Sequence, residues 1–145
     1  MSEQAPKAFV TGSAGFIGYH LCRRLLDDGF QVTGFDGMTD YYDVRLKQRR
    51  HQMLAQSATF SPVEGLLEED GLLHGLLESE QPDIIVHLAA QAGVRWSIEN
   101  PRAYLDANLI GTYNLLEAVR ATPCKHLLMA STSSVYGASP DMPYA

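Results

Sequence analysis

The sequence predicts an α/β fold: a Rossmann-like, doubly wound parallel sheet with helices on both faces. Three observations carry this prediction. Short apolar segments alternate along the 145 residues with longer segments of helical periodicity. A glycine-rich loop joins the first apolar segment to the first helix. The segment at 83–88, DIIVHL, is apolar enough for a strand buried on both faces, which is typical of parallel sheets connected by right-handed crossovers.

The first half of the chain is predicted to contain three strands, at 7–10, 31–35 and 59–63. A helix over 14–28 separates the first two, because Ile17, Leu21 and Leu25 recur at a spacing of four and Gly29 can end it. A more charged helix is expected over 43–55.

The second half adds two helices and two strands. A helix over 69–80, weakened by two glycines and stopped by Pro82, precedes the strand at 83–88. Asn100 as N-cap and Pro101 as first residue open a long helix, and a fifth strand spans 125–130. A doubly wound nucleotide fold has a sixth strand, which this chain does not reach. We therefore expect residues 1–145 to form one incomplete domain, with five strands present, truncated before the sixth.

Composition excludes several classes of function. Eleven Lys and Arg against 17 Asp and Glu give a formal charge of -6, which argues against a nucleic-acid binder. No apolar run approaches the roughly 18 residues of a membrane span, and the polar N-terminus resembles no secretory signal, so a cytoplasmic location is expected. The cysteines and histidines share no ligand spacing, so no metal site is expected, and His87 is predicted to be a hydrogen-bonded core residue.

The loop at 11–18, TGSAGFIG, is typical of dinucleotide phosphate loops. Gly12 permits a sharp turn, Gly15 lets a diphosphate approach the backbone, and Gly18 lets the helix pack closely. The N–H groups at the start of the helix attract the anion. We predict cofactor contacts along this loop, from Gly12, Gly15, Phe16, Ile17 and Gly18.

Asp36 ends the second strand, 18 residues after Gly18. A carboxylate there accepts hydrogen bonds from ribose hydroxyls and repels a 2′-phosphate, which favours NAD over NADP as cofactor. Alternatively, Asp36 only begins a turn with Gly37. The basic run at 45–50, RLKQRR, is the solvated face of a helix, a contact to cofactor or UDP phosphates, or a partner surface.

The loop and later segments of the chain resemble the extended short-chain dehydrogenase/reductase family. The loop has the family spacing TGxxGxxG, and the family's later landmarks are matched by HLAA at 87–90, Asn108 and STSSVYG at 131–137. The resemblance covers nearly the whole chain. Within the family, DYYDV at 40–44 and HLAAQAGVR at 87–95 make the chain most similar to UDP-glucuronate 4-epimerases. UDP-glucose 4-epimerases, the nearest alternative, are less similar in these segments.

The resemblance implies further cofactor contacts. Leu88, Ala89 and Ala90 would lie against NAD, and Asn108 would support the sheet beside the site. Leu66 stands where many relatives have an Asp that contacts adenine, so adenine contacts are expected to be apolar and from the backbone.

The resemblance also implies substrate-binding residues for a UDP-sugar. Thr132 would hydrogen-bond the reacting sugar hydroxyl, and Ser133 and Ser134 would lie beside cofactor and substrate. Arg95 would contact the substrate or form a structural ion pair. The long helix, with Leu105 and Leu109, would either be core or contribute to a homodimer of the full-length protein.

The implied reaction is reversible oxidation at the sugar C4 by NAD, through a 4-keto intermediate, with a tyrosinate base from a Tyr-xxx-Lys pair. No such pair occurs in this chain. Tyr144 is the one candidate for the tyrosine and is disfavoured, because Pro143-Tyr144 resembles the loop before the catalytic segment. The chain alone is therefore expected to be inactive and to self-associate through the edge at Leu127 and Met129.

Two other functions are alternatives. A sugar 4,6-dehydratase would need acidic residues after Thr132, where Ser133 and Ser134 stand. A non-catalytic dinucleotide-sensing module would use the fold only for binding. A Tyr-xxx-Lys pair downstream would favour the enzyme over the sensor.

Overall fold

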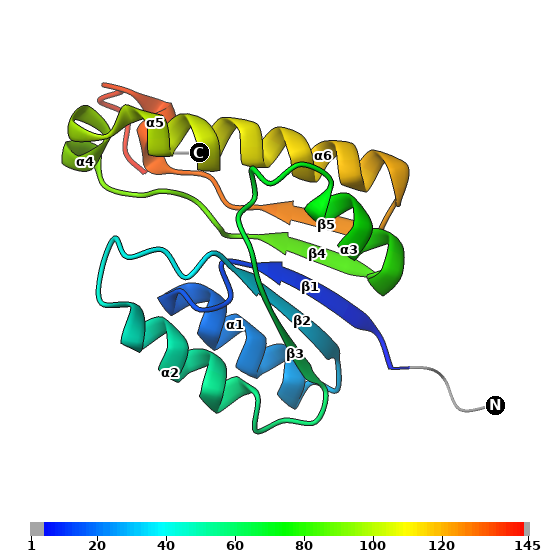
Figure 1. Cartoon of the computed structure of the whole chain (residues 1–145). Helices are drawn as coiled ribbons and strands as arrows, with labels where there is room; N and C mark the ends of the chain where they lie inside the picture. The colour runs from blue at the N-terminus through cyan, green and yellow to red at the C-terminus, as the bar shows by residue number, and fades with distance from the viewer. Residues whose placement is uncertain (1–4, 144–145) are drawn as a thin grey trace.

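Five parallel strands form one sheet in the computed structural model, which describes residues 5–143 (Figure 1). The strand order is β3-β2-β1-β4-β5, so the chain builds outward from the central β1 in one direction and then in the other. This order confirms the predicted doubly wound fold. The strands are β1 (Lys7–Thr11), β2 (Gln31–Asp36), β3 (Phe60–Glu64), β4 (Ile84–His87) and β5 (His126–Met129).

Helices cover both faces of the sheet (Figure 1). On one face lie α1 (Phe16–Asp27) and α2 (Val44–Leu54), and on the other lie α3 (Leu72–Glu80) and α6 (Gly111–Ala121). Alternate strand residues point into two separate cores. Val10 and Val86 pack with the first helix pair, whereas Phe9 and Ile85 pack with the second. The central strands are thus buried on both faces, as the apolar run at 83–88 predicts.

Helix boundaries depart from the predictions where glycine or proline intervenes. The predicted helix over 69–80 begins at Leu72, because Gly71 has a left-handed backbone with φ of 74°. Pro62 lies inside β3, opposite Gly34 of β2. No strand pairs with the outer side of β3, because β3 is an edge strand. The N–H that Pro62 lacks therefore costs the sheet no hydrogen bond on that side.

The long helix predicted from Pro101 is interrupted. It consists of α5 (Pro101–Tyr104), a π-helical segment η1 (Leu105–Ile110) and α6. A short helix that the sequence analysis missed, α4 (Val94–Glu99), precedes it. Asn100 occupies the N-cap position, but its side chain makes no capping hydrogen bond. Its N–H donates to Trp96 O at 2.8 Å and so ends α4, which corrects the predicted capping role.

The outer edge of β5 is uncovered in the part of the chain that the structure describes. Leu128 and Met129 are 47% and 39% exposed, so the predicted apolar edge is present. Leu127 is not part of it, because its side chain is partly buried and packs against the core beneath α6. Across residues 5–143, no helix is long and apolar enough to cross a membrane.

Candidate functional site

A pocket of about 510 Å³ opens at the carboxyl ends of the strands. It lies where the strand order reverses between β1 and β4, which is where doubly wound sheets bind ligands. Most residues predicted to bind the cofactor line it: Gly12, Gly15, Asp36, Leu66, Leu88, Ala89 and Ala90. Four others do not line it: Phe16, Ile17, Gly18 and Asn108.

Gly12 and Gly18 of the 11–18 loop are tightly packed, as the sequence predicts. Gly12 has a φ of 74°, and a Cβ there would lie 2.8 Å from the backbone N of Ala89. A Cβ on Gly18 would lie only 2.0 Å from Gly12 O. The loop is therefore pressed between the start of α1 and the segment after β4. Thr11 reinforces this contact, because its Oγ1 accepts from the N–H groups of Leu88 and Ala89 at 3.2 and 3.1 Å.

The side chains of Phe16 and Ile17 point away from the pocket. They are 67% and 68% exposed in the first turn of α1. Gly15 is the N-cap of this helix, and no side chain caps it. The first N–H groups of a helix lack partners within the helix. Any contact of Phe16 or Ile17 with a phosphate would therefore come from the backbone.

Asp36 is buried and organises the loops around it. Its Oδ2 accepts from the N–H of Ala14 at 3.0 Å, and its Oδ1 accepts from the N–H of Met38 at 2.9 Å. The second bond is the turn that the sequence analysis offered as the alternative role. Asp36 also lines the pocket, so the turn leaves its contact with ribose hydroxyls open as a prediction. Each carboxylate oxygen can accept a further hydrogen bond from a ligand.

Lys47 is a pocket residue that the sequence analysis did not single out from the basic run. Its side chain is buried, and its Nζ donates to the backbone O and the Oγ1 of Thr39 at 2.8 and 3.0 Å. Burial lowers the pKa of Lys47, and the charge of Asp36 opposes that shift. The solvated-face interpretation is therefore wrong for Lys47. It holds for Arg45, which is exposed and pairs with Asp43.

The wall formed by the segment after β4 is held by the helices that follow it. The Asn108 side chain accepts from the N–H of Gln91 at 2.7 Å and donates to its O at 2.9 Å. The Tyr104 hydroxyl donates to Ala92 O at 2.6 Å and also contacts Gly93 O. Asn108 thus supports the site from outside the pocket, as the family resemblance implies.

His87 is a core residue at the end of β4. It is 5% exposed, and its Nδ1 lies 2.7 Å from Thr11 Oγ1 in a buried hydrogen bond. Burial lowers the pKa of its imidazole, which favours the neutral form. The prediction of a hydrogen-bonded core imidazole is confirmed. Within residues 5–143, no cluster of three His, Cys, Asp or Glu side chains could hold a metal ion.

The predicted substrate residues lie outside the pocket. Arg95 is exposed on α4, with no carboxylate of the described segment within ion-pair distance. Thr132 is exposed and caps a 3₁₀ turn, η2 (Ser133–Tyr136), by accepting from the N–H of Ser134 at 3.2 Å. Ser133 and Ser134 are exposed as well. Tyr144 lies outside the described residues.

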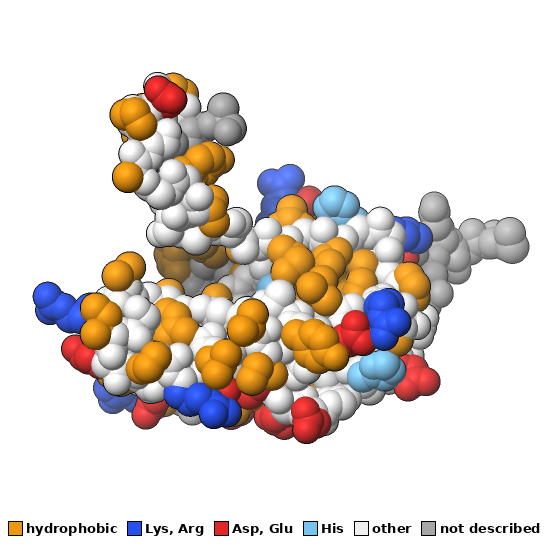
Figure 2. Space-filling view, turned by 90° about the horizontal axis from the view of Figure 1, so that it is seen from above, with side chains coloured by type: hydrophobic (Ala, Val, Ile, Leu, Met, Phe, Trp, Pro, Cys, Tyr) orange, Lys and Arg blue, Asp and Glu red, His pale blue; other side chains and the backbone are white. Residues whose placement is uncertain are grey.

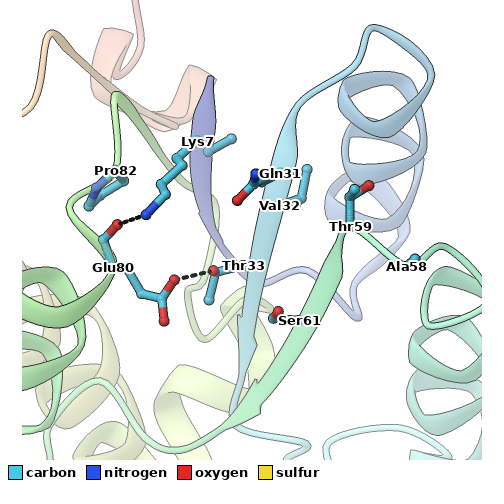
Figure 3. A pocket seen from close by; sticks show the side chains of 10 residues that line it. Lys7, Gln31, Val32, Thr33, Ala58, Thr59, Ser61, Glu80 and Pro82 are labelled. Carbon is cyan, nitrogen blue, oxygen red and sulfur yellow. Dashed lines mark hydrogen bonds between the residues drawn. The ribbon is translucent and has the colours of Figure 1, made fainter. Parts of the chain in front are cut away.

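A second hollow, of about 260 Å³, lies at the opposite ends of β1, β2 and β3 (Figure 3). Lys7 Nζ donates to Glu80 O at 3.0 Å, and Thr33 Oγ1 donates to Glu80 Oε2 at 3.2 Å. These polar groups partner one another, and the hollow is separated from the glycine loop by the length of the strands.

The chain matches a known protein family over most of its length. The sequence profile of the NAD dependent epimerase/dehydratase family matches residues 8–145. A probable UDP-glucuronate 4-epimerase of Rhizobium meliloti is 55% identical over 136 residues, which are 94% of this chain and 40% of that protein.

Two solved structures share the fold. The UDP-glucuronic acid 4-epimerase of Bacillus cereus, in complex with UDP-glucuronic acid and NAD, has a TM-score of 0.85 at 35% identity, covering 93% of this chain and 43% of that one. The UDP-glucose 4-epimerase of Bifidobacterium longum, in complex with NAD+ and UDP, has a TM-score of 0.80 at 28% identity, covering 95% and 40%. The chain therefore spans less than half the length of the proteins it matches.

Proposed function

Because the chain belongs to the NAD dependent epimerase/dehydratase family, we propose that it is the NAD-binding portion of a UDP-sugar 4-epimerase. The substrate proposed is UDP-glucuronate, converted to UDP-galacturonate through a 4-keto intermediate. The observation that carries the proposal is the pocket itself, where the glycine loop, Asp36 and the segment after β4 converge. The similarity to UDP-glucuronate 4-epimerases, at 55% and 35% identity, supports this choice of sugar over UDP-glucose.

The residues present fit NAD. The space above Gly12 and Gly15 would take the diphosphate, next to the uncapped start of α1. Asp36 would accept from the adenosine ribose hydroxyls, and the buried ammonium of Lys47 lines the same pocket. Leu66, 37% exposed at the rim, would provide an apolar adenine contact. When bound, NAD would supply the acceptor and donor of hydride.

The substrate residues are proposed from the family resemblance, and they lie outside the pocket. Thr132 would align the reacting sugar oxygen, Ser133 and Ser134 would lie beside it, and Arg95 would contact the substrate. All four are exposed in the described part of the chain. The base would come from a Tyr-xxx-Lys pair that this chain does not contain. The chain by itself is therefore predicted to be inactive.

We also propose that the full-length protein is a homodimer through the helical layer of α5, η1 and α6. Leu105, Leu109, Tyr113 and Leu116 recur at helical spacing and are 42–64% exposed. Figure 2 looks onto this layer and shows apolar side chains gathered along it. Leu105 and Leu109 are not core, so that alternative is wrong. The cytoplasmic location stays a prediction, compatible with the free thiols of Cys22 and Cys124.

Two measurements test the proposal. Calorimetric titration of the chain is expected to show weak NAD binding and weaker NADP binding, and no NAD binding would contradict the cofactor assignment. A longer protein that contains this chain and a downstream Tyr-xxx-Lys pair is expected to convert UDP-glucuronate to UDP-galacturonate, which NMR of the sugar detects. A product other than a C4 epimer would contradict the reaction proposed.

A further inference from the structure

A buried hydrogen bond joins the glycine loop to helix α2. Ser13 Oγ and His51 Nε2 lie 2.7 Å apart, although the two residues are 38 positions apart in sequence. Ser13 is fully buried, and His51 is 8% exposed. A buried hydroxyl without a partner costs more free energy than a net hydrogen bond contributes. The imidazole is therefore the partner that satisfies the Ser13 hydroxyl, while the backbone N–H of Ser13 donates to Phe35 O at 3.3 Å.

The surrounding packing leaves the pair little room to rearrange. Ser13 Oγ lies against Gly34 of β2, where a Cβ would come within 2.8 Å of it. The same Cβ would lie 2.6 Å from the ring of Phe60. The His51 ring meets Phe60 edge-on, with the ring centroids 5.6 Å apart. The Ser13 hydroxyl and the Phe60 ring thus occupy space that a side chain at residue 34 would take.

The next residue of the loop is held by the same two elements. The N–H of Ala14 donates to Asp36 Oδ2 of β2 at 3.0 Å. Its carbonyl accepts from Arg50 Nη1 of α2 at 3.0 Å. Residues 13 and 14 are therefore bound on both sides immediately before Gly15, the N-cap from which α1 starts.

The charges around His51 come from several elements. Asp36 of β2 and Glu64 of β3 raise its pKa, but burial has the larger effect and lowers it. On its own helix, Lys47 shares the buried face and Arg50 is adjacent in sequence. The neutral imidazole favoured by burial has one donor and one acceptor nitrogen, so it can pair with a hydroxyl in either tautomer.

We propose that His51 is a positioning residue for the phosphate loop. By holding Ser13, it keeps the N–H groups at the start of α1 directed at a diphosphate before the ligand arrives, which lowers the ordering cost of binding. The inference rests on the proposed function of the pocket and assigns to α2 a part in diphosphate binding. His51 does not line the pocket and so acts through Ser13.

The test compares His51→Leu, His51→Gln and the control Gln52→Leu in this chain, with ADP and adenosine as probes. Gln52 is exposed and next to His51 on α2. His51→Leu is expected to weaken ADP binding roughly fivefold, the size of one net hydrogen bond, and to leave adenosine binding within about twofold. His51→Gln, which can still pair with Ser13, is expected to restore most of the ADP affinity. Equal losses for ADP and adenosine without rescue by glutamine would overturn the inference, because they indicate a general packing role.

Hydrogen exchange of the ligand-free chain gives a second readout that does not require binding. His51→Leu is expected to speed exchange of the amides at 13–16 and not those of β4 or α6, and Gln52→Leu to leave all of them unchanged. Unchanged exchange at 13–16 in His51→Leu would overturn the positioning role. Failure of the unmodified chain to bind ADP would instead contradict the proposed function, and the exchange data would then decide the role of His51 alone.

Discussion

Replacing Asp36 with alanine removes a carboxylate whose two oxygens both accept backbone hydrogen bonds. The N–H of Ala14, at 3.0 Å, is buried, so its loss of a partner is expected to cost about 1–3 kcal/mol of unfolding free energy. The N–H of Met38, at 2.9 Å, is in a partly buried turn that water can reach, so its loss should cost less. The substitution therefore affects stability as well as cofactor binding, and the two must be measured separately.

The effect on binding comes from the ribose. Loss of charge-assisted hydrogen bonds to its hydroxyls is expected to weaken NAD binding by about 1–3 kcal/mol, or roughly fivefold to a hundredfold. NADP affinity should fall less or rise, because the carboxylate that repels the 2′-phosphate is gone while Lys47 remains in the pocket wall. The preference for NAD over NADP should therefore shrink.

Calorimetry with both cofactors, together with urea unfolding, separates these effects. Asp40→Ala is the matched control, because Asp40 is exposed in the same β2–α2 connection and does not line the pocket. Equal NAD affinity in Asp36→Ala and the unmodified chain would refute the ribose assignment. An equal loss of NAD and NADP affinity would show that the substitution acts through the displaced loop at Ala14 and not through recognition of the ribose.

Three further predictions concern the loop, the substrate side and the open edge. Gly18→Ala brings a Cβ to 2.0 Å from Gly12 O, so the free energy of unfolding measured in urea should fall by about 1–3 kcal/mol or more. An unchanged urea midpoint would mean that the loop can shift to accommodate the methyl group at no cost. Thr132→Val in a longer, active protein should lower kcat on the order of 10²–10⁴-fold with little change in NAD affinity, and an unchanged kcat would assign the role to another hydroxyl. In sedimentation the chain should self-associate through the β5 edge, where Leu128 and Met129 are 47% and 39% exposed. Leu128→Lys should reduce the self-association, and a chain that stays monomeric at high concentration would contradict it.

Features that depend on neighbours in sequence were predictable. The glycine loop could be recognised because turn, close approach and helix start all fall within residues 11–18, and the structure confirms tight packing at Gly12 and Gly18. Asp36 was predictable because it ends a strand whose direction and length follow from its apolar pattern. The alternation of strands and helices was enough for a doubly wound parallel sheet, since right-handed crossovers leave few topologies.

Other features were missed because they depend on residues distant in sequence. Helix α4 has six residues, too few for a repeating apolar pattern to indicate a helix, and none of them is buried. The π-helical turn at 105–110 has ordinary helical composition. Lys47 and His51 lie on the buried face of α2 with Leu54, at spacings of four and three. That spacing could have indicated a buried helix face. Basic residues at those positions nevertheless favour a solvated face when the sequence shows no partner for them.

The fold class, the phosphate loop and the acidic residue at the end of β2 could be predicted from the sequence, because each follows from local backbone preference or from the periodicity of apolar residues. The side chains that meet around the pocket are known only from the folded chain. Lys47 is buried beside Thr39, and His51 pairs with Ser13, because the β-α-β crossover folds α2 back over the start of α1. Burial then changes what a charged or titratable side chain does, since it replaces water with a few fixed partners. Those partners come from separate segments of the chain, and no local sequence pattern predicts that these segments meet.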